Sequence, residues 1–406
     1  MASPSFPPRK RARLAPAASD GGVLSADELQ EVLLRLPSKP LGRLRAICHE
    51  WRSLISSPHF VAAHASRRPP DSLVVAAVVD PADSRRVDVK LLDMASGAVV
   101  AHLDGLRGGH FAACGDLLCH VGPRGDGGVR VVNPATGAVT ELPGFAQTSS
   151  AYVLGHVPRT GEYKVLHIHS IDNKPDQSCA ILTLGSGELR WRPVQSPPMR
   201  VETTISRNRV VTQGVAHFLS PHLVECDNIA SFDLDKEEWR PTVIQGPLSD
   251  EGRHRCREHL SLVELNGYLV MVHHNYRERS MDIYFLLDSA KGTWSRTNSV
   301  CFSSILRGWE SKQELRVGEK VEVPRNQEHV ARPLMVLEDG SVAFCVGYPS
   351  GALRVYDLAT GDCKDVAQLG PATSIAGLYT GSLLALVQNN SLAMESLAIT
   401  NRQVVV

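Results

Sequence analysis

The sequence has no long hydrophobic run and no paired cysteines, and each absence excludes a class of protein. Its longest apolar stretch is residues 73–79, far shorter than the ~20 residues that a membrane-spanning helix needs. Nine cysteines are scattered along the chain, with no Cys-x-x-Cys pair and no secretory leader before them. Such cysteines are typical of free thiols in a reducing compartment. We therefore expect a nuclear or cytoplasmic protein, neither secreted nor embedded in a membrane.

An excess of charge of either sign is also absent. The chain has 43 Lys and Arg residues and 43 Asp and Glu residues, so its formal net charge is zero. No global field attracts such a protein to nucleic acid or to an acidic membrane surface. With 43% hydrophobic and 21% charged residues, the 406 residues suffice for one small and one large globular domain. We expect neither nucleic acid nor a membrane among its partners.

Motifs that carry catalysis are missing as well. The sequence contains no Gly-rich nucleotide-binding loop, no His-Glu-x-x-His zinc motif and no Gly-x-Ser-x-Gly nucleophile motif. Metal-ligand residue types cluster at His254, Cys256 and His259, but a second ligand pair at tetrahedral spacing is lacking. An exposed basic loop explains this cluster better than a zinc site. We expect no metal, no cofactor and no catalytic activity.

Residues 1–22 are rich in Pro, Ala, Ser, Gly and basic side chains and contain little that a core would bury. This composition is typical of a disordered tail. A compact basic cluster lies inside it, of the kind that nuclear import receptors bind: Arg9, Lys10, Arg11 and Arg13. A solvated tail with a chance run of charges is the alternative reading.

Residues 23–66 have a helical pattern. After Ser25, a candidate N-cap, apolar residues recur at spacings of three and four until Pro37 ends the pattern. A second apolar stripe runs from Leu41 to Ile55, with charged residues between its members, and Pro58 ends it. The segment therefore predicts a small helical domain.

Residues 67–406 change to the period-two pattern of strands and contain a repeated turn. The repeat has an Asp or Asn, a Gly four places later and a packing residue two places after that. The acidic or amide side chain bonds the turn backbone, and the Gly supplies a positive φ. Complete copies span 93–99, 133–139, 288–294 and 357–363; the copy at 233–239 lacks the Gly and the copy at 183–189 lacks the acid.

The spacing of these repeats predicts a kelch-like β-propeller with six or seven four-stranded blades. Trp191, Trp239 and Trp294 lie near the turns and are expected to pack between blades. We expect residues 73–79 to close the ring by pairing with 383–387 or 392–399. A charged insertion runs from Cys301 to Arg332, where Trp309 is either an anchor for a bound protein or a residue packed against a blade.

The helical segment resembles the F-box family. That family's acidic helix start, its Leu-rich helix ending in Leu-Pro, its Leu-Arg pair and its Cys-x-x-Trp-Arg ending match residues 27–29, 32–37, 44–45 and 48–52. Ser25 departs from the pattern, because it stands where the family usually has its first proline. The β region resembles, less specifically, the F-box-associated or kelch-like domains of plant proteins, through the phrase Glu162-Tyr163-Lys164-Val165.

The resemblance implies an α+β multidomain chain with a disordered tail (1–22), a three-helix F-box (23–66) and a propeller (67–406). It also implies that the F-box docks on a Skp-type adaptor and, through it, on a cullin. The docking face would consist of Leu24, Leu29, Val32, Leu33, Leu36, Pro37, Leu41 and Leu44. The F-box core would consist of Ile47, Cys48, Trp51, Leu54 and Ile55. A plain helical hairpin packed on the propeller is the alternative.

The function implied by the resemblance is substrate recognition within an SCF-type ubiquitin ligase. The propeller would bind a protein target, and ubiquitin transfer would take place on other subunits. A glycan- or small-molecule-binding propeller of lectin type, with an accessory F-box, is the second hypothesis. Nothing in the sequence names the target, because loop side chains set it in three dimensions.

Overall fold

The structure is a computed structural model that divides into two compact units, Met1–Arg67 and Arg68–Val406, each described here by itself. It describes residues 26–36, 41, 44, 47–57, 59–60, 63–64, 73–80, 83, 85–123, 128–134, 138–144, 150–170, 176–185, 188–221, 227–248, 260–275, 278, 280–297, 299–305, 331–346, 351–370 and 373–381. Within this part of the chain, no helix is long and apolar enough to cross a bilayer.

The first unit contains α1 (Ala26–Leu34) and α3 (His49–Ser56), and Leu41 and Leu44 between them are also helical. Asp27 and Glu28 occupy the first turn of α1, where the helix dipole favours negative charge. The buried apolar side chains of this unit are Leu33, Leu34, Leu41, Ile55 and Phe60. Both described helices therefore bury apolar side chains within this unit.

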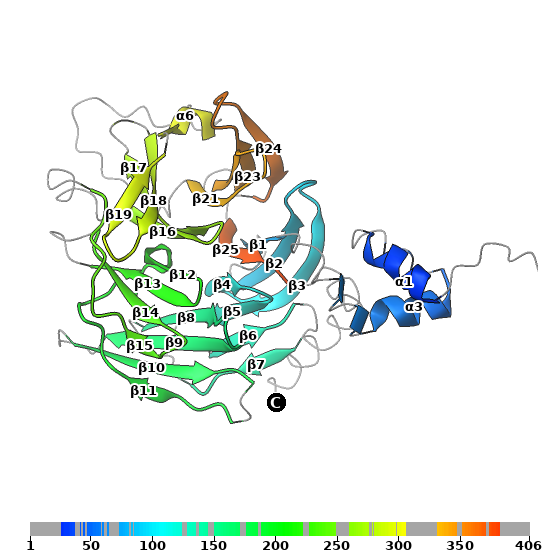
Figure 1. Cartoon of the computed structure of the whole chain (residues 1–406), viewed down its shortest axis with the longest axis horizontal. Helices are drawn as coiled ribbons and strands as arrows, with labels where there is room; N and C mark the ends of the chain where they lie inside the picture. Colours follow the sequence, from blue (N-terminus) through cyan, green and yellow to red (C-terminus); the bar gives the residue numbers. More distant parts are fainter. Residues whose placement is uncertain are drawn as a thin grey trace, which may run out of the picture. The chain divides into compact units, whose positions relative to one another are not determined.

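The second unit consists of six antiparallel sheets, the blades of a propeller (Figure 1). Blade 1 combines the C-terminal strand β25 (Thr373–Tyr379) with β1 (Leu73–Val79), β2 (Arg86–Asp93) and β3 (Val99–Arg107). Blade 2 contains β4 (His110–Cys114), β5 (Leu117–Val121), β6 (Val129–Val132) and β7 (Val139–Glu141). Blade 3 contains β8 (Ser150–His156), β9 (Tyr163–Ser170), β10 (Gln177–Thr183) and β11 (Arg192–Val194).

The remaining three blades follow in chain order. Blade 4 contains β12 (Arg209–Thr212), preceded by the 3-10 helix η1 (Ser206–Asn208), then β13 (Val215–Leu219), β14 (Ile229–Asp233) and β15 (Glu238–Trp239). Blade 5 contains β16 (Leu260–Leu265), β17 (Tyr268–Asn275), β18 (Ser280–Asp288) and β19 (Thr293–Arg296), with β20 (Val300–Cys301) paired to β18. The short helix α6 (Phe302–Ile305) precedes blade 6: β21 (Ala331–Val336), β22 (Val342–Val346), β23 (Ala352–Tyr356) and β24 (Cys363–Gln368).

Ring closure uses a strand that the sequence pattern did not reveal. β1 pairs with β25 from Leu73 opposite Tyr379 to Val78 opposite Thr373, so blade 1 joins both ends of the β unit. The expected closing segments, 383–387 and 392–399, lie outside the described residues, and the assignment of closure to them was wrong. The alternation of β25 is broken by Gly377, whose φ of 136° lets the strand pass close to Ala113 of blade 2.

The core of the propeller lies between the blades rather than inside any one of them. Six clusters of buried apolar residues occur, and each joins the facing sides of two neighbouring blades. Strands such as β1, β13 and β22 are consequently buried on both faces and read as nearly continuous apolar runs. The prediction of a propeller is confirmed, with six blades.

Candidate functional site

The repeated turn has the geometry that its residue types predict. The Asp93 carboxylate accepts a hydrogen bond from the Ala95 amide at 2.9 Å, and Gly97 follows with a φ of 66°. Asp288 and Asp357 make the same contact two residues ahead, at 2.9 and 2.7 Å. Each turn joins the third strand of a blade to its fourth, so the motif begins where the third strand ends and leads into the outer strand.

Three tryptophans, one each in blades 3, 4 and 5, connect their blade to the one before it. The indole N–H groups of Trp191, Trp239 and Trp294 donate to the backbone carbonyls of Pro143, Gln195 and Gln245 at 3.0, 2.9 and 2.8 Å. Each acceptor lies just after the outer strand of the preceding blade. The expected role of these residues in packing between blades is confirmed.

The phrase Glu162-Tyr163-Lys164-Val165 also holds blades together. The Tyr163 hydroxyl donates to the Asp116 carboxylate of blade 2 at 2.6 Å. The Lys164 ammonium donates to the Leu234 carbonyl and to the Glu237 carboxylate of blade 4, both at 2.9 Å. Neighbouring residues of a strand point to opposite faces, so this one strand of blade 3 reaches both adjacent blades. The motif that signals the family is therefore part of the scaffold.

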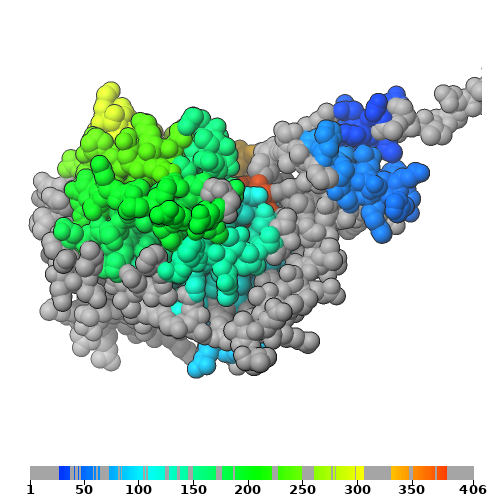
Figure 2. Space-filling view, turned by 90° about the horizontal axis from the view of Figure 1, so that it is seen from below, coloured from blue at the N-terminus to red at the C-terminus, as the bar shows by residue number. Residues whose placement is uncertain are grey.

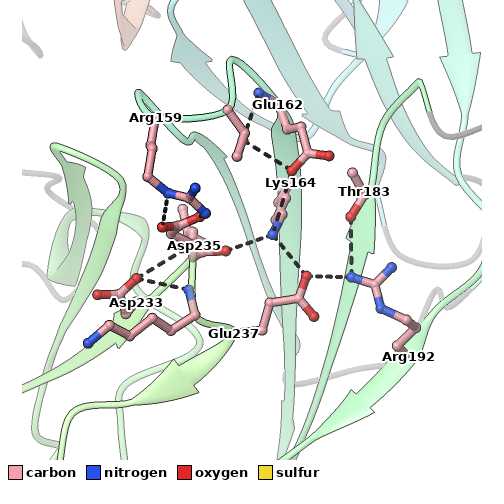
Figure 3. A network of polar contacts seen from close by, with 11 residues as sticks. Arg159, Glu162, Lys164, Thr183, Arg192, Asp233, Asp235 and Glu237 are labelled. Atoms are coloured by element: carbon pink, nitrogen blue, oxygen red, sulfur yellow. Dashed lines mark hydrogen bonds and ion pairs between the residues drawn. The ribbon is translucent and has the colours of Figure 1, made fainter.

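Figure 3 shows the polar contacts on the blade 4 side of this strand. The Arg192 guanidinium reaches the same Glu237 oxygen at 2.5 Å and also donates to the Thr183 hydroxyl at 3.2 Å. Nearby, Arg159 forms a two-pronged pair with Asp235 at 2.7 and 2.8 Å. The Lys164 side chain is only 7% exposed, so its positive charge depends on these partners.

The two ends of the propeller carry different kinds of connection. Because the strands of each blade run antiparallel from the centre outward, the first-to-second and third-to-fourth connections share one end, here named the turn end. Its connections are short: 115–116, 213–214 and 266–267 are examples, and 184–191 is the longest. The opposite end, here named the loop end, carries the successive long connections 195–208, 240–259 and 297–330. Blades 3 and 4, in green, form one continuous surface in Figure 2.

The longest of these connections is fastened at both of its described ends. Phe302 and Ile305 of α6 are buried between blades 5 and 6, and the Arg354 side chain donates to the Ile305 carbonyl. At the other end, the His274 ring lies 2.7 Å from the carbonyl of Ala331. His274 is thus a buried structural contact. Among the described residues, no group of three metal-binding side chains occurs.

In the described part of the helical unit, two large apolar side chains are exposed. Val32 on α1 is 47% exposed and Ile47, just before α3, is 65% exposed. Leu29, Leu36 and Leu44 are half-buried. An exposed apolar surface on so small a unit is where a partner would gain contact area. Among the described residues expected to face the adaptor, Val32 is the most accessible.

Four residues of the helical unit differ from expectation in how exposed their side chains are. Leu33 and Leu41, expected on the docking face, are 1% and 0% exposed, because the core of a unit this small takes its most apolar helix positions. Ile47 and Cys48, expected in the core, are exposed. Cys48 is the N-cap of α3, and its sulfur accepts a hydrogen bond from the Trp51 amide at 3.4 Å. A cap lies outside the helix, where capping residues meet solvent.

The other residues expected in the F-box core are at least half-buried. Ile55 is fully buried, while Trp51 and Leu54 are half-buried. Several expected positions lie outside the described residues: Leu24, Pro37, Trp309, Arg9, Lys10, Arg11, Arg13, His254, Cys256 and His259. The expected roles of these residues remain predictions.

Comparison with known proteins matches both units to families. Residues 24–62 match the F-box domain, and residues 111–348 match the F-box associated beta propeller domain. Among curated relatives, F-box/LRR-repeat protein At2g43260 of Arabidopsis thaliana is 24% identical over 310 residues, which cover 70% of this chain and 69% of the relative. F-box protein At3g07870 of the same plant is 25% identical over 389 residues, covering 85% and 88%.

Solved structures resemble the fold only distantly. The SapL1 lectin in complex with alpha methyl fucoside has a TM-score of 0.39 at 10% identity, over 75% of this chain and 97% of that one. A prolyl endopeptidase has a TM-score of 0.37 at 13% identity, over 74% of this chain and 39% of that one. At these values, neither likeness bears on activity.

A small helical domain followed by a closed six-bladed ring is the arrangement of the F-box proteins with a propeller receptor domain. The chain belongs to the F-box associated beta propeller family, and its helical unit is an F-box. This pairing of domains points to a substrate-recognition adaptor rather than to a lectin. F-box proteins with propeller domains are typically non-catalytic.

Proposed function

We propose that the chain is the substrate-recognition subunit of an SCF-type cullin ubiquitin ligase. The observation that supports this most directly is the F-box match over 24–62 followed by a rigid six-bladed ring. The F-box binds a Skp-type adaptor, and the ring holds a target protein. Catalysis takes place on other subunits, and this chain supplies proximity and orientation. We place the protein in the nucleus, the cytoplasm or both.

The adaptor contacts the exposed apolar surface around Val32. Val32 contributes its half-exposed side chain directly, and Leu29 and Leu36 extend the surface along α1 and just beyond it. Leu24, Pro37 and Leu44 belong to the same proposed face. Leu33 and Leu41 support it from beneath, because both are buried. We include Ile47 in this face because its side chain is exposed.

Substitution of the two exposed residues tests this assignment. V32D/I47D places two charges on the proposed contact surface, where a desolvated charge without a partner opposes binding. We expect the affinity for a purified Skp-type adaptor to fall at least tenfold, or about 1.4 kcal/mol, in calorimetric titration. L287D is the matched control, because Leu287 of the propeller is also exposed, at 61%.

Folding is checked separately. Circular dichroism and the melting temperature of V32D/I47D should match those of the unsubstituted chain, because both side chains are at the surface. Undiminished adaptor binding by the folded double variant would contradict the assignment. Complete failure of the unsubstituted chain to bind any Skp-type adaptor would contradict the proposed function itself.

A further inference from the structure

Two exposed apolar side chains lie at the turn end of blade 5. Tyr268, at the start of β17, is 50% exposed, and Leu287, near the end of β18, is 61% exposed. The register of β18 against β19 shifts between Leu286 and Asp288, so Leu287 is the extra residue of a bulge. A bulge re-aims the side chain of its extra residue, and here that side chain is apolar and faces solvent.

Further apolar side chains lie beside Tyr268 at the junction of blades 5 and 6. The rings of Tyr268 and Phe285 meet edge to face, with their centroids 6.0 Å apart. Phe285, Val336 and Leu358 are partly buried against the apolar cluster that joins the two blades. The Asn266 side chain fastens the turn before Tyr268 to blade 6, because its amide donates to the Val336 carbonyl at 3.0 Å and its oxygen accepts from the Val336 amide at 3.2 Å.

The register of the central strands brings Leu287 to the same place. Val270 of β17 is opposite Phe285 of β18, and two residues further along each strand the same antiparallel ladder leads to Tyr268 and Leu287. Blades 5 and 6, yellow to orange in Figure 1, are neighbours in the ring. Their apolar surface at the turn end is here named the junction face and consists of Tyr268, Phe285, Leu287, Val336 and Leu358.

Acidic side chains surround the junction face. If each turn is counted with two strand residues on either side, the turn-end connections of blades 5 and 6 carry six acidic residues and two lysines. Asp288 directly follows Leu287 and Asp357 directly precedes Leu358, so charge lies beside the apolar side chains. The acidic residues are Glu264, Asp288, Glu338, Asp339, Asp357 and Asp362, and the lysines are Lys291 and Lys364.

Hydrogen bonds keep part of this acidic group ionised. Backbone hydrogen bonds from Ala359 and Thr360 hold the pKa of Asp357 below its ordinary value, and the charge of Asp339 opposes that shift. The carboxylates of the two blade 6 turns are therefore close enough to interact. Of the lysines, Lys291 pairs with Asp288 at 3.7 Å, which leaves the excess of negative charge on the other turns.

The rest of the turn end is nearer to neutral. Counted in the same way, the described turns of blades 3 and 4 carry six acidic residues and five Lys or Arg residues, and those of blades 1 and 2 carry four acidic residues and two arginines. In blades 3 and 4 the charges pair directly, as Lys164 and Arg192 do with Glu237 (Figure 3). The largest excess of negative charge therefore lies on the two blades that share the junction face.

An apolar face ringed by carboxylates is complementary to a segment with both apolar and cationic side chains. Lys and Arg cover apolar surface with their aliphatic stems while their charged ends remain in solvent, within reach of carboxylates. The Tyr268 ring, half-exposed, attracts a cation over its face. An acidic or phosphorylated segment would instead meet like charge at this face, which opposes association.

We propose that the junction face binds a basic and apolar segment of the target protein. Tyr268 and Leu287 contact its apolar side chains, and the surrounding acidic residues, Glu338 and Asp362 among them, contact its Lys and Arg side chains. This inference rests on the proposed function, because it assumes that the propeller is the target receptor. It names the chemical class of the target segment.

Binding of defined peptides to the purified full-length chain tests the proposal. Three fluorescent peptide libraries of equal length share two fixed leucines and random flanks, and they differ at four fixed positions, which are all Lys, all Ser or all Glu. We expect fluorescence anisotropy to show the Lys library binding at least tenfold tighter than the Ser library, and the Glu library binding most weakly. A fourth library keeps the lysines but replaces both leucines by serine, and it should bind at least tenfold more weakly than the Lys library.

Removal of charge from the face tests its acidic part. E338Q/D362N neutralises two exposed carboxylates, and the Lys library should bind this variant at least threefold more weakly. The matched control is E188Q/E238Q, which removes two exposed carboxylates from blades 3 and 4 and should leave binding unchanged. The difference between the two variants should shrink as salt is added, because salt screens exposed charges.

Removal of apolar surface tests the other part. Y268S/L287S should weaken binding of the Lys library at least tenfold, because both side chains lose the contact area that they offer. V99S/V139S is the matched control, since Val99 and Val139 are 52% and 40% exposed on blades 1 and 2. If Y268S/L287S melts at a lower temperature than the unsubstituted chain, L287S alone is compared in its place.

The remaining outcomes assign the face to something else or remove it. Equal binding of the Lys, Ser and Glu libraries, or unchanged binding by both E338Q/D362N and Y268S/L287S, would overturn the proposal. Because the tail is itself basic, R9Q/K10Q/R11Q/R13Q is measured in parallel, and peptide binding seen only in this variant would make the tail the occupant. A dimer in sedimentation that Y268S/L287S abolishes would assign the face to a second copy, against the proposal.

Adaptor binding is measured on the same samples. Loss of peptide selectivity with intact adaptor binding contradicts the junction face alone. Absence of adaptor binding in the unsubstituted chain, with peptide selectivity intact, contradicts the proposed function and leaves the binding face in place.

Discussion

Glu237 occupies a backbone conformation that glycine holds in the sister turns. Its φ is 58°, against 66°, 61° and 75° for Gly97, Gly292 and Gly361 at the equivalent position. A residue with a Cβ is strained there, by roughly 1 kcal/mol or more. The carboxylate compensates by binding the ammonium of Lys164 and the guanidinium of Arg192. At this position the turn is more strained than with glycine, but the side chain links blade 4 to blade 3.

Replacing this residue by glycine separates the two effects. E237G relieves the strain but leaves the buried Lys164 with only the Leu234 carbonyl among its blade 4 partners. Because loss of a partner from a buried charge outweighs the relief, we expect the β unit to lose about 1–3 kcal/mol of stability, measured by urea unfolding. E237Q, which keeps the hydrogen bonds, should lose less. R159Q should leave the unfolding midpoint unchanged because its pair is exposed. A more stable E237G would show that the network contributes nothing.

Among the elements, the junction of blades 5 and 6 is built differently from its neighbours. Three successive junctions are joined by Trp191, Trp239 and Trp294, but in blade 6 the repeat position of Trp239 and Trp294 is held by Cys363. Phe302 and Ile305 of α6 are buried in the same cluster as Cys363. The segment after β19 therefore fills the space that a smaller residue leaves, and it starts the long connection from a fixed point.

The closing strand β25 provides a test at the same scale. Truncation after Gly370 removes β25, including the fully buried Tyr379, and exposes the edge of β1. Apolar side chains that pack with Tyr379, such as Leu73 and Val75, lose part of their burial. Each apolar side chain that loses its burial costs about 1.5–3 kcal/mol, against a total stability of roughly 5–15 kcal/mol. We expect insoluble or protease-sensitive protein. Truncation after Gly381, which keeps β25, should remain soluble and unfold cooperatively in a thermal melt. The reverse pattern would show that closure lies C-terminal to β25.

At the scale of the whole molecule, the two units divide the proposed work. The F-box carries the exposed apolar side chains proposed to contact the adaptor, whereas the propeller carries its long connections at one end, where binding residues are common on rigid folds. The six interblade clusters make the ring a rigid support for those connections.

The insertion that contains Trp309 is a proposed site of target contact. Replacement of 306–325 by a Gly/Ser linker keeps Ile305 and Ala331, the fixed points on either side. We expect unchanged melting temperature and adaptor binding, but loss of the proteins that co-purify from proteasome-inhibited cells, identified by mass spectrometry. W309A alone should reproduce most of that loss if the side chain is the anchor. Recovery of the same proteins from both variants would place recognition elsewhere on the propeller.

Local features were predictable from the sequence, because their causes lie within a few residues. The Asp and Gly of each turn act on their own backbone, so the repeats and the blade-like architecture could be read directly. The F-box landmarks likewise depend on helix period and on proline positions. The tryptophans could be assigned to interblade contacts because all three lie near these turns.

Only the tertiary structure decided which partners meet across long sequence separations. Leu33 is buried while its neighbour Val32 is exposed, a choice set by how the helices pack rather than by hydrophobicity. Ring closure joins residues 73–79 to 373–379, and periodicity carries no information about partners 300 residues away.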